Sequence, residues 1–271
     1  MATEAAGIDI PNLTVNGTED RPRSRISILL LQLLVGVCFI GAWQFASGRL
    51  IDPFFISSPA EVGARLLTWA SDGTLTIHLT YTLTATAIGF VIGATLGFCV
   101  GFALGRNELL AAVLSPYITA LYCLPKIALA PLVIMWFGIG IESKIAMSGL
   151  VVFFLVFLNT YSGVREVSAV HINSLRIMGG NELELLRYVF IPSAMSWVLA
   201  GLKVSVPYAL IGTVVGEIMS SNRGIGFLIA QASGTFDTPS VFAGLALLAA
   251  VGVIVNSLLN VFEAHVLRWK R

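Results

Sequence analysis

Charged residues are scarce in this sequence. Asp, Glu, Lys and Arg make up 11% of its 271 residues, whereas hydrophobic residues make up 56%. Soluble domains average about 25% charged residues, so this composition excludes an ordinary soluble domain and indicates an integral membrane protein. The formal net charge is only +1, which gives no basic footprint for binding a nucleic acid.

Cysteine and histidine are rare as well, and the recognised catalytic motifs are absent. Cys38, Cys99 and Cys123 lie within apolar stretches, so we expect them to pack rather than to form disulfides. The three histidines are scattered, with no carboxylate or cysteine at metal-ligand spacing. No HExxH, GxSxG or GxxxxGK[ST] motif occurs. We therefore predict no catalytic residue, no metal site and no ATP hydrolysis by this chain alone.

Six apolar segments are long enough to cross a membrane, because a helix needs about 20 apolar residues to span the hydrocarbon core. They cover residues 26–46, 79–105, 114–138, 144–164, 193–218 and 240–264. The sequence thus predicts an all-α integral membrane protein with six transmembrane helices. The first helix (26–46) and an outer segment (47–78) precede a core domain of five helices (79–268). Residues 1–25 predict a disordered cytoplasmic tail rather than a signal peptide.

Basic residues are unevenly distributed between the two sides of these spans. If the N-terminus is inside, ten lie on the inner side: Arg21, Arg23, Arg25, Arg106, Arg165, Arg176, Arg187, Arg268, Lys270 and Arg271. Four lie on the outer side: Arg49, Arg65, Lys144 and Arg223. Because short loops rich in Lys and Arg stay cytoplasmic, we predict cytoplasmic N- and C-termini and a cytoplasmic segment 165–192.

The outer segment contains a helix start. Ser58 to Glu61 forms a capping-box pattern with Pro59 at the first helical position. We expect a short interfacial helix here, and a turn at 222–226 before a second short apolar segment. Two interpretations stay open for both segments: an anchor in the lipid headgroups, or a contact for an outer partner.

The segment 165–192 is a charged island between two apolar spans. Its pattern predicts a helix, a break at Gly179 and Gly180, and a second helix over 181–191 that stops at Pro192. Asn181 is the expected cap of that second helix, with Glu184 completing a capping box.

The second of these helices is expected to expose an apolar face made by Leu183, Leu186 and Phe190. Such a face at a membrane surface is typical of a docking site for a partner or of a lipid-interface element. Because the segment is predicted to be cytoplasmic, its partner should be cytoplasmic too.

Glycine recurs every four residues in the second span, at Gly89, Gly93, Gly97, Gly101 and Gly105. Small residues allow close backbone approach, which is a main way to pack helices in a bilayer. The stripe predicts either static helix packing within one subunit or a helix contact that slides while the protein functions.

Charged residues and prolines at membrane depth are the candidates for lining a translocation path. Pro125 and Pro131 interrupt the third span with Lys126 between them, and the fifth span contains Lys203 and Glu217. Charges at this depth usually face a protein interior or an aqueous cavity, and prolines free backbone carbonyls that need a buried or wetted setting. The alternative for the lysines is snorkelling or a bond to freed carbonyls, and Glu217 could pair with a cation or cap an outer gate.

One motif in the charged island resembles a known family. Gly179, nine residues and a Val189 to Pro192 ending resemble the cytoplasmic signature loop of ABC importer permeases, in which EAA, three residues and a glycine precede nine residues and I-x-L-P. Asn173, Ser174 and Leu175 occupy the EAA positions here, which is a departure from that pattern.

Further stretches over roughly residues 50–268 resemble the nitrate/sulfonate/taurine-type subfamily of these permeases. They are Ser57-Ser58-Pro59 with Val62, His78-Leu79, Gly89-Phe90, Pro125, Pro131-Leu132, Trp136 to Gly140, Ser143 to Ile145, Asn159-Thr160 with Gly163, and Gly224 to Gly226.

The resemblance implies a type I ABC importer permease in the cytoplasmic membrane, working by alternating access. It implies a second permease copy, as a homodimer, two cytoplasmic ATPase subunits that carry ATP and Mg, and an external solute-binding protein. The segment from Gly180 to Ile191 would be the lever held by the ATPase. The groove would hold Leu183, Leu186 and Phe190, and Glu182, Glu184 and Arg187 would make rim contacts.

The implied substrate is nitrate, a sulfonate, taurine or a related small solute, with a neutral vitamin precursor as the alternative. Two non-transporter classes are the alternatives to an importer permease. A membrane-embedded enzyme would need titratable groups gathered at one depth, and Lys126, Lys203 and Glu217 are isolated in the sequence. A membrane receptor or scaffold would not need charged, kinked spans.

Overall fold

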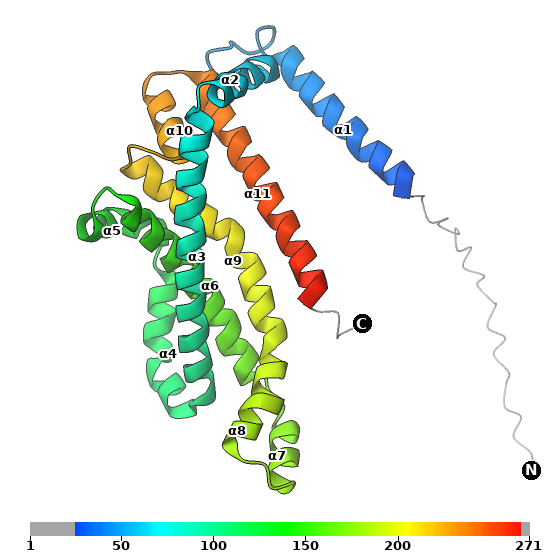
Figure 1. Ribbon diagram of the computed structural model, residues 1–271, viewed down its shortest axis with the longest axis vertical. Coiled ribbons are helices and arrows are strands. Elements are labelled where there is room, and N and C mark those ends of the chain that lie inside the picture. The colour runs from blue at the N-terminus through cyan, green and yellow to red at the C-terminus, as the bar shows by residue number, and fades with distance from the viewer. Residues whose placement is uncertain (1–24, 267–271) are drawn as a thin grey trace, which may run out of the picture.

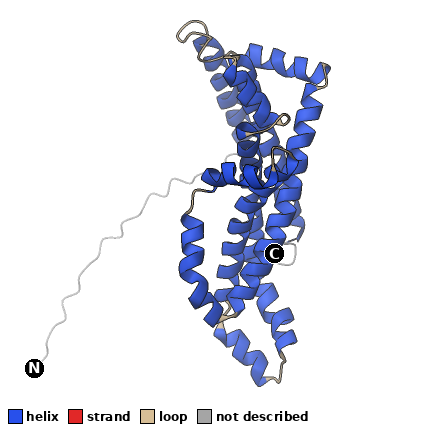
Figure 2. Ribbon diagram, turned by 90° about the vertical axis from the view of Figure 1, so that its left-hand side faces the viewer, coloured by secondary structure: helices blue, strands red, loops and turns tan. Residues whose placement is uncertain are grey.

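The fold is entirely helical over the residues that the computed structural model describes, 25–266 (Figure 2). The predicted tail lies almost wholly outside that range. The long helices are α1 (Arg25–Ala46), α3 (Thr74–Arg106), α6 (Ile141–Arg165), α9 (Ile191–Met219) and α11 (Thr238–Val266). The shorter ones are α2 (Pro59–Ser71), α4 (Glu108–Cys123), η1 (Lys126–Leu129), α5 (Ala130–Phe137), α7 (Ala169–Ile177), α8 (Glu182–Leu185), η2 (Leu186–Phe190) and α10 (Ile225–Gly234).

Five of the described helices are long and apolar enough to cross a membrane, and a sixth span is possible if one bent pair counts as a single crossing. That pair is α4 with η1 and α5, bent by 85° at the break. The predicted third span, 114–138, is therefore not one continuous helix. Leu124, which precedes Pro125, has an extended backbone, because the proline ring disfavours the helical region for the residue before it.

The centre of the molecule is formed by α3, α6 and α9, which run along its length (Figure 1). All five glycines of the stripe on α3 are buried. A Cβ on Gly93 would collide with the carbonyl oxygen of Gly149 on α6, and one on Gly97 would lie 2.7 Å from the Phe153 carbonyl oxygen. The stripe thus packs two helices of the same chain at backbone contact. Sliding along this contact stays a prediction.

At one end of the molecule α2, α10 and α11 pack together, and α7 and α8 lie at the opposite end (Figure 1). The expected helix after Ser58 is α2, with the capping box in place. Its Val62 and Trp69 are buried against Leu228 of α10 and Ala243 of α11. We call this region the outer end, after the predicted orientation.

Helix α1 leans away from the other helices (Figure 1). None of its apolar span is buried in the single chain. It is tied to the outer end near its own C-terminus, where the indole nitrogen of Trp43 donates to the Ser57 carbonyl at 2.7 Å. The rest of α1 is left for lipid or for another protein chain.

The three cysteines do not fill the interior of the chain. Cys38, Cys99 and Cys123 are free and exposed, so the expectation that they pack within the fold is wrong for the isolated subunit. Apolar stretches in a membrane protein also cover the lipid-facing surface, and composition alone does not separate that surface from the core.

Candidate functional site

The segment between α6 and α9 has the predicted helix, break and helix. After α7 the backbone turns at Gly179, whose φ of +81° is readily adopted only by glycine. The amide of Gly180 donates to the Leu175 carbonyl at 2.9 Å, which ends the helix. We call residues 165–192 the docking segment, after the role expected from the sequence.

Leu175, one of the residues at the EAA positions, packs directly on this turn. A Cβ on Gly180 would lie 2.6 Å from the Leu175 Cγ, so the leucine side chain occupies the space that the glycine leaves. Asn173 and Ser174 are exposed. The departure from the family pattern therefore affects one residue that packs and two that face solvent.

The cap of the second helix is confirmed. The Glu184 amide donates to Asn181 Oδ1 at 2.9 Å, and the Asn181 amide donates to Glu184 Oε2 at 2.8 Å. This reciprocal pair satisfies two amides at the helix start. The Glu184 carboxylate therefore caps the helix of its own segment.

The predicted stop at Pro192 is wrong. The helix continues from Glu182 to Met219 as one unbroken span, and a π-helical turn, η2, lies just before the proline. Proline lacks an amide and clashes with the carbonyl four residues back. The wider bonding of a π turn accommodates this clash inside a helix.

The expected apolar face is only partly exposed. Leu183 is 72% exposed, whereas Leu186 and Phe190 are half-buried. The buried positions of this stretch are Leu185 and Val189.

Exposed apolar residues lie on both sides of the break. They are Val170 at the start of α7, Ile177, Met178 and Leu183. Ile177 and Met178 are 87% and 83% exposed. They come from the end of α7 and the turn, whereas Leu183 comes from α8, so the exposed apolar surface involves both helices of the docking segment.

The charges of the docking segment connect it to α3. Glu182 accepts from Arg106 at 2.9 Å and from Arg176 at 3.4 Å. The Arg106 guanidinium also lies 5.1 Å from the centre of the Phe190 ring, within cation–π range. We call Arg106, Arg176, Glu182 and Phe190 the clasp.

Of the expected rim residues, Glu182 belongs to the clasp and Arg187 is exposed beside Tyr188. Arg106 was not among the predicted site residues. Nothing in the sequence pairs it with Glu182, since the two are 76 positions apart.

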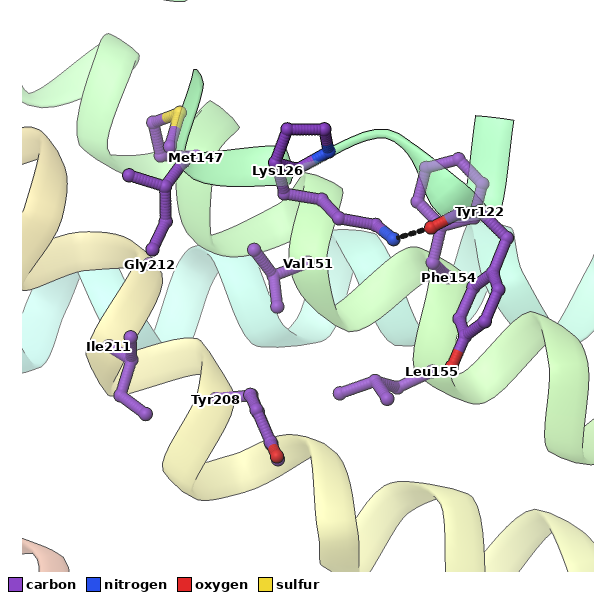
Figure 3. A pocket seen from close by; sticks show the side chains of 11 residues that line it. Tyr122, Lys126, Met147, Val151, Phe154, Leu155, Tyr208, Ile211 and Gly212 are labelled. Carbon is purple, nitrogen blue, oxygen red and sulfur yellow. Dashed lines mark hydrogen bonds between the residues drawn. The ribbon is translucent and has the colours of Figure 1, made fainter. Parts of the chain in front are cut away.

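A cavity of about 460 Å³ lies where the α4–η1 break faces α6 and α9 (Figure 3). Pro125 and Lys126 line it, as predicted for path residues, together with Tyr122, Phe154 and Tyr208. The three aromatic residues carry no charge and have no motif, and sequence reasoning missed them.

The Lys126 ammonium is held by its neighbours in this cavity. It donates to the Tyr122 carbonyl oxygen and lies 4.4 Å from the Tyr122 ring centre and 5.1 Å from that of Phe154. Lys126 therefore does both things that were considered for it: it lines the cavity, and it bonds a backbone carbonyl near the helix break.

The other path candidates lie elsewhere. Pro131, in the first turn of α5, and Lys203, half-buried on α9, are not among the residues that line this cavity. Lys126 and Lys203 therefore do not line the same cavity.

Glu217 is buried at the outer end, where it bonds neutral groups rather than a cation. Its carboxylate accepts from the Thr82 hydroxyl at 2.8 Å and from the Gly226 amide at 2.8 Å. The Thr82 hydroxyl in turn accepts from the Ile225 amide at 2.9 Å. This outer cluster joins α3, α9 and the start of α10.

A family model matches residues 89–268 of this chain and is described as "Binding-protein-dependent transport system inner membrane component". The chain belongs to this family. It is a multi-pass inner-membrane permease of an ABC importer for small solutes, which agrees with its apolar helices. The resemblance to the sulfonate and taurine type of permease is confirmed as well.

Curated relatives extend over most of the permease. The riboflavin transport system permease protein RibX of Chloroflexus aurantiacus is 36% identical, over 92% of this chain and 91% of its own length. The formylaminopyrimidine transport permease protein ThiX of Halalkalibacterium halodurans is 30% identical, over 84% and 91%. The putative aliphatic sulfonates transport permease protein SsuC of Bacillus subtilis is 30% identical, over 100% and 98%.

Solved structures support the fold of the permease. A chain of an amino acid ABC transporter aligns with a TM-score of 0.59 at 18% identity, covering 73% of this chain and 96% of its own. A chain of the inward-facing MetNI methionine ABC transporter aligns with a TM-score of 0.56 at 20% identity, covering 70% and 93%. At such identities the likeness concerns the type I importer permease fold alone.

Proposed function

We propose that this permease forms the translocation path of its importer and is driven by a separate cytoplasmic ATPase that binds the docking segment. The observation that carries the proposal is the exposed apolar surface of Ile177, Met178 and Leu183 at one end of the molecule. Apolar side chains that stay 72–87% exposed at a membrane surface are typical of a protein contact site.

The orientation is part of the proposal. The docking segment carries Arg165, Arg176 and Arg187, and the positive-inside rule assigns such loops to the cytoplasm. The outer end with α2 and α10 would then face the opposite side, where an external binding protein delivers the solute.

The mechanism follows from how the docking segment is attached. α8 and η2 continue into α9 without a break, and the clasp joins the same segment to the end of α3. A push on the segment by the ATPase would move α9 and α3 together. Such a push shifts the population only if the two arrangements differ in their contacts with the ATPase.

A second copy of the permease would complete the path. Ile127, Tyr208 and Ile211 line the cavity and are 57%, 46% and 49% exposed in the single chain. Their open side is suited to face the same surface of a partner copy, which supports the homodimer as the assembly around the path.

The proposed solute class comes from the compounds named in the descriptions of the relatives. Their names cover aliphatic sulfonates and taurine on one side and riboflavin and formylaminopyrimidine on the other. The first group agrees with the expected sulfonate-type solute, and the second with the vitamin-precursor alternative. Both groups are small organic compounds, and we propose that the transported solute is one too.

The test is reconstitution of the permease with its ATPase and its solute-binding protein. We expect ATP-dependent uptake of a solute into vesicles, with ATP hydrolysis stimulated by the loaded binding protein. A receptor or scaffold would bind the same partners without moving solute, so stable complex formation with no uptake would contradict the proposal.

A further inference from the structure

The cavity at the α4–η1 break combines a single cation with aromatic walls (Figure 3). We propose that it binds a planar aromatic solute with one carboxylate or carbonyl edge, rather than a small aliphatic sulfonate. This inference rests on the proposed function, because it takes the cavity to be part of the path. It distinguishes between the two solute groups that remain open.

Lys126 supplies the polar end of the site. Its ammonium has three donors, of which one bonds the Tyr122 carbonyl oxygen. The others are left to meet an acceptor on a solute. The ammonium lies over the rings of Tyr122 and Phe154, 4.4 and 5.1 Å from their centres, so an acceptor that reaches Lys126 brings the rest of the solute beside these two rings.

The remaining walls are apolar. Met147, Val151 and Leu155 of α6 and Ile211 of α9 line the cavity, and Tyr208 adds a phenol on the α9 side. Figure 3 shows Tyr208 and Ile211 on one helix, across the cavity from Lys126 and Tyr122. A flat solute between these two sides would contact aromatic and aliphatic side chains on both faces.

The two solute groups differ in the part of the solute that lies away from Lys126. A carboxylate and a sulfonate each bring one anionic end that Lys126 can partner, so that end does not distinguish them. Taurine also carries an ammonium group, and the described residues that line the cavity include no carboxylate to partner it; burying a charged group without a partner is costly. An aromatic solute loses little hydration from its ring faces and gains from stacking on aromatic side chains. Cavities of this kind, mostly apolar with a few polar groups, orient a ligand through those groups.

The experiment measures binding of 2-naphthoate and of taurine to the full-length permease in lipid nanodiscs by isothermal titration calorimetry. We expect 2-naphthoate to bind at least tenfold more tightly than taurine. Lys126→Gln and Tyr122→Leu should each weaken 2-naphthoate binding about tenfold, whereas Tyr122→Phe, which keeps the ring, should retain it. Thermal unfolding of each variant confirms that it is folded.

Two matched controls lie outside the cavity. Arg49→Gln removes a cation that also lies over an aromatic ring, 4.8 Å from the Phe45 centroid. Tyr117→Leu removes an exposed tyrosine from the same helix as Tyr122. Both should leave 2-naphthoate binding unchanged.

Taurine binding as tight as that of 2-naphthoate, absence of 2-naphthoate binding, or equal losses in the cavity and control variants would overturn the inference. The proposed function fails separately, since it requires ATP-dependent uptake of some solute by the reconstituted complex. Uptake without any aromatic preference would leave the function standing and remove only the assigned solute class.

Discussion

The two ends of this permease differ in which groups they bury and which they expose. At the outer end the polar groups are inside: Thr82 and Lys144 are fully buried, Glu217 is 1% exposed, and each has hydrogen-bond partners within the chain. At the docking segment the apolar groups are outside, with Ile177, Met178 and Leu183 exposed and the ion pairs on the surface. The chain itself supplies the partners of the polar groups at the outer end, whereas the apolar surface at the other end is the one that we propose binds the ATPase.

This contrast predicts where substitutions act. When one partner of a buried hydrogen bond is removed, the remaining polar group can bond neither its former partner nor water. This costs about 1–3 kcal/mol of stability. Exposed ion pairs contribute about 0–1 kcal/mol, and exposed apolar residues contribute little to folding. We therefore expect outer-end variants to lose stability, and docking-segment variants to lose coupling while remaining folded.

The largest effect on stability is expected for Thr82→Val. The substitution keeps the shape but removes the hydroxyl that donates to Glu217 and accepts from the Ile225 amide, so two buried groups lose their partner. We expect a loss of about 2–4 kcal/mol in the free energy of unfolding, measured by titration with denaturing detergent. Thr80→Val is the control, because the Thr80 hydroxyl is on the exposed side of the same helix. Equal losses in the two variants would contradict the described cluster.

A smaller loss is expected from Gly93→Ala in the stripe between α3 and α6. The added methyl group would meet the Gly149 carbonyl oxygen, and overpacking of this kind costs about 1–3 kcal/mol. Gly252→Ala on α11 has nothing within 4 Å of the new Cβ and should be neutral or slightly stabilising. If Gly93→Ala were as stable as the control, the close contact would be wrong.

Features set by local spacing could be predicted from the sequence. The capping boxes at Ser58 and Asn181 depend on residues three positions apart, and the glycine repeat places small residues along one side of a helix. The break at Pro125 was predicted too, but the 85° bend was not. A proline rule states that a helix is interrupted, whereas the angle depends on the packing of the two halves.

The misassigned face of the docking segment has a specific physical cause. The expectation for Leu186 and Phe190 treated this stretch as an isolated helix that stops at Pro192. The stretch is instead the start of a continuous span up to Met219, and Leu185 and Val189, each one position earlier on the helix, are the residues that it buries. Contacts such as Arg106 with Glu182 or Thr82 with Glu217 join residues 76 and 135 positions apart, and no local pattern indicates them.

The clasp offers a weaker test of the same contrast. Reversing one charge, as in Arg106→Glu or Glu182→Arg, should reduce stability by less than about 1 kcal/mol, because the pair is exposed. The double variant restores the pair with the charges exchanged, although Arg176 then repels the new arginine. Solute-stimulated ATP hydrolysis should fall in both single variants, with partial recovery in the double variant. Full activity in both single variants would remove the clasp from the mechanism.

The role of the docking segment in ATPase binding is tested by comparing Leu183→Asp with Leu67→Asp. The two leucines are equally exposed, 72% on α8 and 74% on α2, and they lie at opposite ends of the molecule (Figure 1). Each variant is co-purified with the ATPase subunit, and its thermal unfolding is recorded. We expect both variants to unfold like the wild type and only Leu183→Asp to lose the ATPase. Normal ATPase binding by a folded Leu183→Asp permease, or equal loss in both variants, would contradict this expectation.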